Sequence, residues 1–469
     1  MASYYPIDDI LNVAAIHPFY NSNATYPPDQ DAIASLRGQA ARQVGKSWSS
    51  WPLLRKDGLY RTIERLCADE SVDNTYRRSS YVSITGGGSG TSLPMLFLTD
   101  SEENFNQRIA MGKLMKACKM VEPSDWVLNL HYSGNFYRSL DLSTSTMELA
   151  GGSVLCGGHL LPHEKSVEAC LQYRVNFLAS DTASLLNFAH HVEALPSSLR
   201  SQLHIAKIMY TSETMSRPKQ DYLRSVFGPV SFFSCLGAGE TGPWAVANLD
   251  WRSNTDEDDA EDSVDFVFDK RSMLVEGLSL SADPQSLPSP QDGDWVSEGV
   301  AGHLVLTSLQ RLRNPLVRYV SGDVGSLHPL SPEVAAQFPV DRVEHLQTLR
   351  LYGRDKRFSF KWLGDYYEFH QMDKMMHSPE WGVLQYQIIL ADDAAKEGSD
   401  CLELRMLRRA EGHGILNVAE LEERLHDAFY LTHHTETQFR AVFLNDLDGF
   451  QRSQSSGKVI RFIDKRRKK

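Results

Sequence analysis

The sequence lacks the features of a membrane-embedded protein and of a disulfide-stabilised secreted protein. No segment approaches the ~20 consecutive apolar residues that span a bilayer. The first residues, MASYYPIDDILNVAAIHPFY, contain no basic region followed by an apolar core. The six cysteines include no CxxC pair, which favours free thiols in a reducing compartment. We therefore predict a cytoplasmic protein with no membrane partner.

Positive charge is also scarce. The formal net charge is −12, and the one dense basic run is residues 465–469. Phosphate neutralisation needs clustered Lys and Arg, so this balance argues against nucleic acid as a partner. Hydrophobic residues make up 42% and charged residues 23%, the balance of a soluble globular protein with a sizeable core.

What the sequence does contain, from about residue 99, is an alternation of helical and strand-like segments. TDSEENFNQRIAMGKLMKACKM predicts a helix with an acidic first turn, and Phe105, Ile109 and Leu114 near helical spacing. Strands are predicted in DWVLNL, GGSVLCGG, YRVNFLAS, LHIAKIMY and PVSFFSCLG. This order indicates an α/β fold with a largely parallel sheet. Ligands bind at the carboxyl ends of such strands, where loops beginning at Gly86, Gly157, Ser212 and Gly237 would gather.

The rest of the chain is organised differently. An acidic stretch at 253–265 and the Pro/Ser-rich SADPQSLPSPQDGD predict exposed loops. A β-rich run follows in GHLVLTSL and PLVRYVSGDVGSL, and the composition changes after LRLYGRDKRFSF. We predict two domains, residues 1–353 and a smaller α+β domain at 354–469.

The stretch YVSITGGGSGTSLP runs from a predicted strand into a bare glycine loop. Such a loop lets a ligand approach main-chain N–H groups, and Ser89, Thr91 and Ser92 add hydroxyl donors, so it is typical of phosphate binding as well as of a plain surface turn. A serine hydrolase using Ser89 is disfavoured because the G-x-S-x-G pattern fails at Thr91. A P-loop kinase or ATPase is disfavoured because no Lys-Ser/Thr pair follows the glycines.

A zinc site is a minor alternative in the segment SVLCGGHLLPH. Cys156, His159 and His163 have spacings that could bind zinc, but no fourth ligand follows at a typical spacing.

Taken in order, nine motifs resemble those of the adenylate-forming superfamily, and within it the phenylacetate–CoA ligase-like branch. They are HPFY, WPLLRKDGLY, the glycine loop, SVLCGG, MYTSE, GAGETGP, RYVSGDVG, YGRDKRF and SSGKVIRFIDKR. The resemblance implies a large N-terminal domain of layered sheets and helices and a small mobile α+β C-terminal domain. It implies that a carboxylate attacks the α-phosphate of MgATP to give an acyl-adenylate and pyrophosphate. The acyl group then passes to a thiol, usually that of coenzyme A.

The resemblance also implies roles for single residues. In the nucleotide site, Ser89, Gly90 and Thr91 would hold the β- and γ-phosphates and Glu240 would bind Mg²⁺. The backbone beside that glutamate would contact the nucleotide at Gly237, Ala238 and Gly239. Asp323 suits the ribose because its two oxygens can serve two hydroxyl donors at once.

At the junction of the two domains, Arg354 would lie near the ribose and phosphates and Asp355 would be the hinge. Lys458 in SSGKVIR would be the catalytic lysine, since a flexible ammonium can reach both the incoming carboxylate and the α-phosphate.

The chain departs from the family pattern at several positions. Leu236 replaces an adenine-stacking tyrosine, and Gly239 replaces a serine or threonine. The phosphate loop lacks one glycine before Leu93 and the basic residue often found there. Looser pyrophosphate binding and unusual adenine contacts are expected.

For the acyl pocket, LHYSGNFY makes His131, Tyr132, Phe136 and Tyr210 candidate wall residues, with ordinary core packing as the alternative. Ser133 and Asn135 stand where apolar groups are common, which favours a polar or aryl acid. The acceptor is expected to be coenzyme A. Alternatives are an amine, a hydroxyl or a carrier-protein thiol, or a nucleotide-binding protein that has lost the chemistry.

Overall fold

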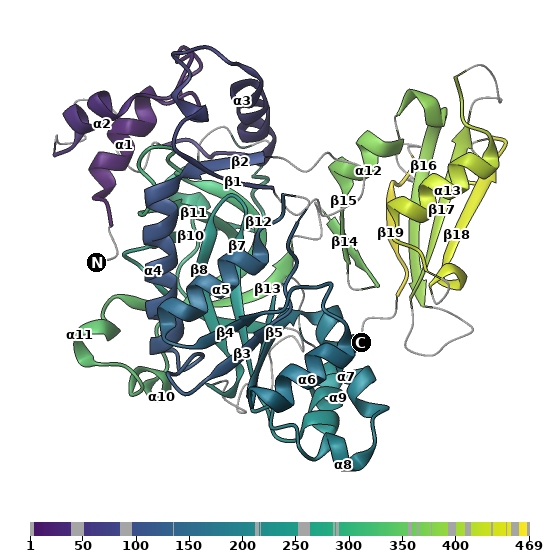
Figure 1. Cartoon of the computed structure of the whole chain (residues 1–469). Coiled ribbons are helices and arrows are strands. Elements are labelled where there is room, and N and C mark those ends of the chain that lie inside the picture. Colours follow the sequence, from purple (N-terminus) through teal and green to yellow (C-terminus); the bar gives the residue numbers. More distant parts are fainter. Residues whose placement is uncertain are drawn as a thin grey trace. The chain divides into compact units, whose positions relative to one another are not determined.

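The computed structural model describes residues 4–38, 51–84, 96–134, 136–211, 215, 217–251, 263–284, 287, 290–354, 359–363, 365–376, 378–392, 400–408, 414–432, 435–446, 448–451 and 459–466. Contacts divide the described residues into a larger unit, within residues 4–354, and a smaller unit, within residues 359–466 (Figure 1).

The larger unit is built on an eleven-stranded sheet with the order β10-β11-β12-β13-β9-β8-β7-β6-β5-β3-β4. One part is parallel and consists of β3 (Trp126–Asn129), β4 (Ser153–Cys156), β5 (Phe177–Asp181), β6 (Lys207–Thr211) and β7 (Ser231–Ala238). The other part is antiparallel and consists of β8 (Gly242–Asn248), β9 (Val264–Asp269), β10 (Met273–Ser279), β11 (Gly302–Ser308), β12 (Tyr319–His328) and β13 (Leu346–Arg354). The prediction of a parallel sheet therefore holds for β3 to β7 alone.

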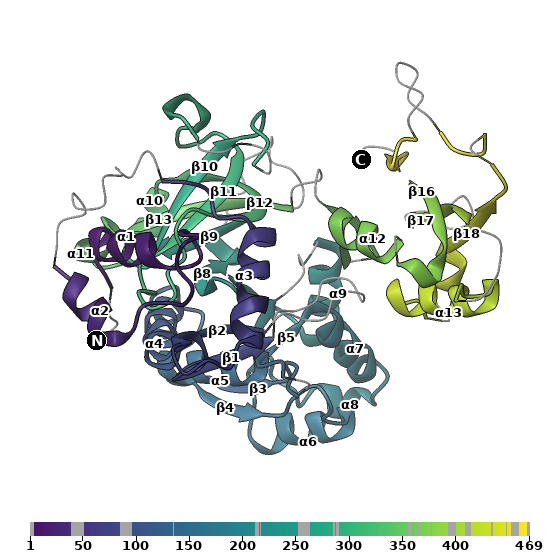
Figure 2. The ribbon, with the colours of Figure 1, turned by 90° about the horizontal axis from the view of Figure 1, so that it is seen from above.

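Helices cover both faces of the parallel strands (Figures 1 and 2). Successive strand residues enter different cores: Phe177 packs in one core and Leu178 in the other, as do Phe233 and Phe232. This alternation follows from the two-residue period of a strand. One core includes α4 (Ser101–Ala117) and α5 (Ser139–Ala150), and the other includes α6 (His163–Gln172), α7 (Thr182–Glu193) and α9 (Arg217–Phe227).

Helix α4 begins where the sequence predicted, after Asp100, whose carboxylate accepts hydrogen bonds from the N–H groups of Glu102 and Glu103. Its faces differ from the prediction. Phe105 is 56% exposed, whereas polar residues of the same helix are buried. These buried polar residues are Glu103, Asn104, Gln107 and Arg108.

The N-terminal part adds α1 (Ile7–Ile16), α2 (Gln30–Leu36), α3 (Lys56–Ala68) and an antiparallel hairpin of β1 (Ser80–Ile84) and β2 (Leu96–Asp100). The short helices are α8 (Ser197–Arg200), α10 (Pro332–Ala335) and α11 (Val340–Val343). The buried face of α3, with Leu59, Ile63 and Leu66, packs in one cluster with Phe97 of β2 and Tyr319 of β12. This packing brings α3 close to the first residue of β12.

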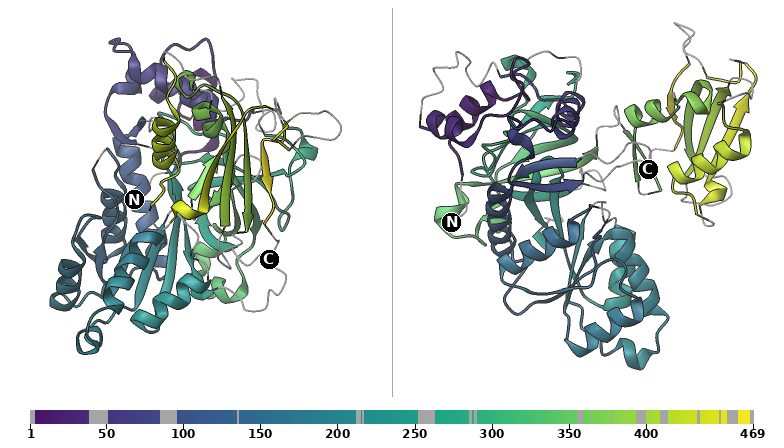
Figure 3. Two further views of the ribbon diagram at one scale, coloured as in Figure 1. Left: turned by 90° about the vertical axis from the view of Figure 1, so that its right-hand side faces the viewer. Right: turned by 45° about the horizontal axis from the view of Figure 1, so that its top comes forward.

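The smaller unit is α+β, with a four-stranded sheet of order β18-β17-β16-β19 (Figure 3). Its strands are β16 (Val383–Asp392), β17 (Asp400–Arg408), β18 (Phe439–Leu444) and β19 (Phe462–Asp464), and a separate hairpin pairs β14 (Ser359–Trp362) with β15 (Asp365–Glu368). The helices are α12 (Phe369–Met376) and α13 (Val418–Ala428). Leu421 and Leu425 of α13 pack with Leu404 and Met406 of β17, so this unit has a core of its own.

Among the described residues, no helix has both the length and the apolar character needed to cross a membrane.

Candidate functional site

The parallel strands deliver several predicted site residues to one edge of the sheet. Strands β3, β5, β6 and β7 run in the same direction, so their carboxyl ends meet at that edge. His131 follows β3, Tyr210 is the penultimate residue of β6, and Gly237 and Ala238 end β7. This is the edge at which the sequence analysis predicted a bound ligand.

The GAGETG motif is a tight hairpin between β7 and β8, and two glycines fix its shape. A Cβ on Gly237 would lie 2.8 Å from the carbonyl oxygen of Gly242. Gly242 has a φ of +66°, and its added Cβ would lie 2.3 Å from Oε1 of Gln107. Inside the turn, the N–H of Ala238 donates to Oγ1 of Thr241 at 3.1 Å. Both glycines are thus needed for the close approach of neighbouring groups.

Glu240 occupies this turn and is buried. Its Oε1 accepts hydrogen bonds from the hydroxyls of Tyr60 on α3 and Tyr319 on β12, the latter at 3.2 Å. In the described part of the chain no partner reaches Oε2. A carboxylate has about four lone-pair sites, so the second oxygen can accept a cation while the first stays fixed by the tyrosines.

Two side chains that the sequence analysis did not identify form hydrogen bonds with the backbone of the turn. Arg311 donates to the carbonyl oxygen of Glu240, and Gln107 donates to the carbonyl oxygen of Thr241 at 2.7 Å. Arg311 is buried, and burial lowers its pKa to about 10, although Glu103 and Glu240 oppose this shift. The turn is therefore positioned by buried polar groups.

Glu103 belongs to the same network. Its Oε1 accepts the N–H groups of Leu312 at 2.9 Å and Arg313 at 3.1 Å, which fixes the backbone next to Arg311. Burial raises the pKa of Glu103 to about 7. Glu103 and Gln107 are four residues apart on α4, a spacing that places two polar side chains on one helix face and could have revealed them.

Asp323 lies on a β-bulge of β12. Residues 321–323 stand opposite the single residue Leu304, and Gly322 has a φ of +82°. Ser321 stabilises the bulge, because its Oγ donates to the carbonyl oxygen of Leu304 at 3.2 Å and accepts the N–H of Asp323 at 3.1 Å. Bulges re-aim side chains at functional sites, which explains the order Ser-Gly-Asp.

Strand β12 connects this bulge to the Glu240 turn. Tyr319, which contacts Glu240, precedes Asp323 by four residues, at most about 13 Å of strand. Arg354 pairs with Asp323 in the register of β13 and β12. The structure thus brings Glu240, Asp323 and the backbone of Arg354 into one region.

Several predicted site residues cannot be compared with the structure. Ser89, Gly90, Thr91, Asn135, Asp355 and Lys458 lie outside the described residues, as does the side chain of Arg354. Leu236, which replaces the family's tyrosine, is half-buried against the cluster that contains Trp244.

The four candidate wall residues of the acyl pocket separate into two pairs. His131 and Tyr210 are buried. The ring of His131 is held by Oδ1 of Asn129 at 2.8 Å and Oγ1 of Thr211 at 3.0 Å, and burial lowers its pKa to about 4. A neutral His131 therefore links the end of β3 to the end of β6. Burial also raises the pKa of Tyr210.

Tyr132 and Phe136 are the exposed pair, with 52% and 76% of their surfaces accessible. The ring of Tyr132 stacks on His159 at a centroid distance of 4.0 Å. Phe136 has a φ of +64°, a conformation that is uncommon outside glycine. The loop is thus firmly held at His131 and presents aromatic surface further along.

The three candidate zinc ligands have separate surroundings. Cys156 lies 3.2 Å from Oγ1 of Thr144, His159 stacks on Tyr132, and His163 lies beside His191. Within the described ranges, no three His, Cys, Asp or Glu side chains are grouped closely enough to hold a metal ion. All six cysteines are free thiols.

Comparisons with known proteins show what this architecture resembles. No protein-family model matches the sequence, and no curated protein matches it. Among solved structures, 2-hydroxyisobutyryl-CoA ligase in complex with 2-HIB-AMP and CoA in the thioesterification state aligns over 97% of this chain and 87% of its own, at 16% identity and a TM-score of 0.63. The amide bond synthetase McbA from Marinactinospora thermotolerans aligns over 82% of this chain and 68% of its own, at 13% identity and a TM-score of 0.50. The chain has the fold of the adenylate-forming enzymes.

Proposed function

We propose that this chain, which has the fold of the adenylate-forming enzymes, activates a carboxylic acid with ATP. A carboxylate oxygen of the acid would attack the α-phosphorus of ATP, and the bond to pyrophosphate would break as the acyl-adenylate forms. The observation that carries the proposal is the joint placement of Glu240 and Asp323. A buried, positioned carboxylate and a carboxylate on a β-bulge are connected through β12, because Tyr319 at the start of that strand hydrogen-bonds to Glu240.

For the nucleotide, we assign Mg²⁺ to Glu240 and the ribose hydroxyls to Asp323. The donor set fits Mg²⁺, which is usually bound by one or two carboxylates together with substrate phosphates. Mg²⁺ held by Glu240 would offset the negative charge of the nucleotide phosphates. Tyr60 and Tyr319 hold the Glu240 carboxylate in one orientation, and Arg311 holds its backbone, so little reorganisation is required when the nucleotide arrives.

The remaining nucleotide contacts rest on the sequence motifs. We assign the phosphates to Ser89, Gly90 and Thr91, the nucleotide-facing backbone to Gly237, Ala238 and Gly239, and the charge near the ribose and phosphates to Arg354. Lys458 would stabilise the negative charge that moves during adenylation. We further propose that residues 354–469 form a mobile domain that turns about Asp355 between the two half-reactions.

For the acid, we propose a pocket at the carboxyl ends of β3 and β6. His131 and Tyr210 would form its inner wall, and Tyr132 and Phe136 its outer wall. The polar residues of the intervening loop favour a polar acid, and the resemblance to the phenylacetate–CoA ligase-like branch favours an aromatic one. Both ring nitrogens of His131 already have partners, and burial lowers its pKa to about 4, so His131 would form an uncharged part of this wall.

The acceptor that we propose is coenzyme A, and the compartment is the cytoplasm, where free thiols persist. The structural likeness to a CoA ligase and to an amide bond synthetase makes an amine the principal alternative acceptor.

The test is an ATP–pyrophosphate exchange assay over a panel of carboxylic acids, followed by mass spectrometry of the products with coenzyme A or an amine present. Acid-dependent exchange with acyl-CoA as product is expected. Amide in place of thioester would change the acceptor assignment, and ATP binding without exchange for any acid would indicate a nucleotide-binding protein without the chemistry.

A further inference from the structure

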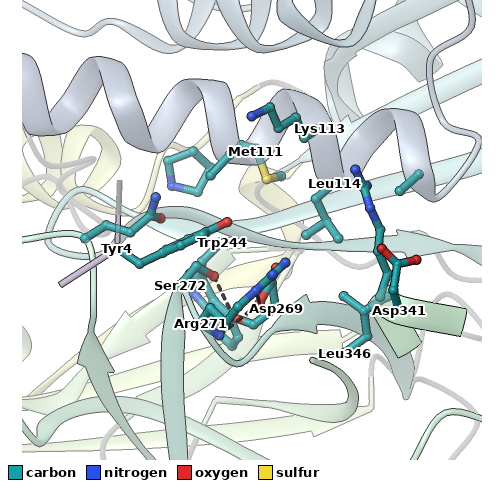
Figure 4. A pocket seen from close by; sticks show the side chains of 15 residues that line it. Tyr4, Met111, Lys113, Leu114, Trp244, Asp269, Arg271, Ser272, Asp341 and Leu346 are labelled. Atoms are coloured by element: carbon teal, nitrogen blue, oxygen red, sulfur yellow. Dashed lines mark hydrogen bonds and ion pairs between the residues drawn. The ribbon is translucent and has the colours of Figure 1, made fainter. Parts of the chain in front are cut away.

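A cavity with a volume of about 460 Å³ lies on the larger unit. Figure 4 shows it as a groove between α4 above and the turn between β9 and β10 below. Tyr4 and Trp244 lie at one end, and Asp341 of α11 and Leu346 of β13 lie at the other (Figure 4). Pro243, which ends the GAGETGP motif, lines the groove, but none of the residues to which the proposed reaction assigns a role does.

The groove is far from the proposed ribose site. Leu346 is the first residue of β13, and Arg354, which pairs with Asp323, is the last. Eight residues of strand separate them, a span of roughly 26 Å. A molecule in the groove would therefore not occupy the proposed ribose site at Asp323.

The apolar part of the lining, here called the floor, comes from both sides of the groove and is well packed. Met111 and Leu114 of α4, Trp244 of β8 and Leu346 are all buried, at 8% exposure or less. An indole and three aliphatic or thioether side chains offer contact to a flat or branched apolar group. Inorganic phosphate would gain nothing from this floor.

One buried polar group in the lining has no hydrogen-bond partner. Gln310 is 3% exposed, and its side-chain Nε2 has no partner in the described structure. Leaving a buried amide donor unsatisfied costs about 1–3 kcal/mol, so an acceptor atom on a bound molecule would relieve that cost. This unpaired donor points to a ligand that carries a carbonyl, carboxylate or hydroxyl oxygen.

The rim supplies more positive than negative charge. Asp269 pairs with Nε and Nη2 of Arg271, at 3.0 Å and 2.7 Å, and leaves Nη1 of Arg271 for another acceptor. Across the part of the chain that the structure describes, the side chains of Lys113 and Arg342 form no ion pair. Three cations therefore face the two carboxylates of Asp269 and Asp341, and N–H donors outnumber acceptors.

We propose that this groove binds a small organic carboxylate with a flat apolar body. The carboxylate pairs with the guanidinium groups of Arg271 and Arg342 at the rim, where N–H donors match carboxylate oxygens. The body lies over Met111, Leu114 and Trp244, and an oxygen on the body accepts the unpaired N–H of Gln310.

The experiment is a calorimetric titration of the full chain with 4-hydroxybenzoate. The adenylation site is first saturated with benzoyl-sulfamoyl-adenosine, so that binding of the probe in the acyl pocket is blocked. We expect a single site that remains titratable in the saturated protein. Benzoate, which lacks the hydroxyl, and 4-hydroxybenzamide, which lacks the charge, should each bind about tenfold more weakly, the effect of one lost hydrogen bond to a charged or buried group.

Two variants and one matched control assign the binding to the groove. Arg342→Gln removes a rim cation from an exposed position, and Gln310→Leu replaces the buried amide by an apolar group of similar volume. Each should weaken 4-hydroxybenzoate binding roughly tenfold. Lys116→Gln removes an exposed charge from the same helix as Lys113, outside the groove, and should leave the affinity unchanged.

Unchanged affinity in both Arg342→Gln and Gln310→Leu, or no binding to the saturated wild-type protein at millimolar concentration, would overturn the proposal. Failure of the proposed function is a separate result: pyrophosphate exchange would then be absent in the wild type, while the effect of the groove variants on 4-hydroxybenzoate binding would remain measurable.

Discussion

The Glu240 turn and the loop of residues 131–137 lie at the same edge of the sheet, but they are held in different ways. The carboxylate of the turn accepts hydrogen bonds from side chains of α3 and β12. Two of its carbonyl oxygens accept hydrogen bonds from side chains of α4 and of the segment after β11. The loop is fixed at His131, and its aromatic residues Tyr132 and Phe136 are exposed. Under the proposed function, the firmly held turn would meet the nucleotide, which presents the same groups in every cycle, and the more exposed loop would meet the acid.

The largest effect is expected at the support of the turn. Arg311→Met removes the donor to the Glu240 carbonyl and leaves the buried carboxylates of Glu103 and Glu240 without their cation. Removing a buried, charged hydrogen-bond donor and leaving its acceptor without a partner costs about 3 kcal/mol or more. Urea denaturation measures this decrease in the free energy of unfolding.

Arg61→Met serves as the control for that variant. Arg61 is an exposed partner of Asp57 on α3, and its loss should cost less than about 1 kcal/mol. If Arg311→Met and Arg61→Met lowered the free energy of unfolding equally, the hydrogen bond from Arg311 to the turn would not stabilise the protein as described.

A smaller effect, dependent on pH, is expected at Glu103. Its pKa is raised by burial to about 7 in the folded protein from an ordinary 4.5. Folding therefore favours the protonated form, and the stability that this confers is complete below pH 4.5 and is lost as the pH rises through 7. The loss amounts to about 3 kcal/mol. Glu103→Gln cannot ionise, so its free energy of unfolding should rise relative to that of the wild type as the pH increases from 4.5 to 7.

Parallel pH profiles of unfolding free energy for Glu103→Gln and the wild type would contradict the burial of an ionisable Glu103. Asp57→Asn, at an exposed position of α3, provides the comparison in which no such divergence is expected.

The smallest effect on stability, with a change in specificity, is expected at the loop. Phe136→Ala should alter the free energy of unfolding by less than about 0.5 kcal/mol, because the side chain is exposed. If Phe136 contacts the acid, the same change should shift relative kcat/KM between aromatic and aliphatic acids by about 1–3 kcal/mol. An equal change for all acids would assign Phe136 to general packing. Leu160→Ala, at another exposed apolar position, controls for loss of surface area.

Strand positions in the larger unit could be predicted from the sequence, since short apolar runs bounded by glycine and polar residues mark β3 to β7. The antiparallel part of the sheet could not be ordered, because strand pairing depends on contacts far apart in the chain. Strand β13, for example, lies between β9 and β12.

The candidate site was predictable where motifs mark it and not where support comes from ordinary helices. Glu240 and Asp323 stood out through GAGETGP and VSGDVG. Glu103 and Gln107 did not, because helix periodicity was judged by apolar residues, and Phe105 was expected inward but is exposed. The buried polar side chains of α4 bond to backbone groups at Thr241 and Leu312, far away in the chain, and their spacing alone does not distinguish this buried face from one that faces solvent.

The most direct test of the central claim is the magnesium dependence of ATP–pyrophosphate exchange in Glu240→Gln, with Asp323→Ala measured alongside. If Glu240 holds the cation, its variant should need more Mg²⁺ and adenylate more slowly, by about 10²–10³ for the loss of one positioned charge-stabilising group. Asp323→Ala should instead weaken ATP binding at an unchanged Mg²⁺ requirement. A wild-type magnesium dependence in Glu240→Gln would contradict the account of the buried turn as the cation-binding end of a nucleotide site.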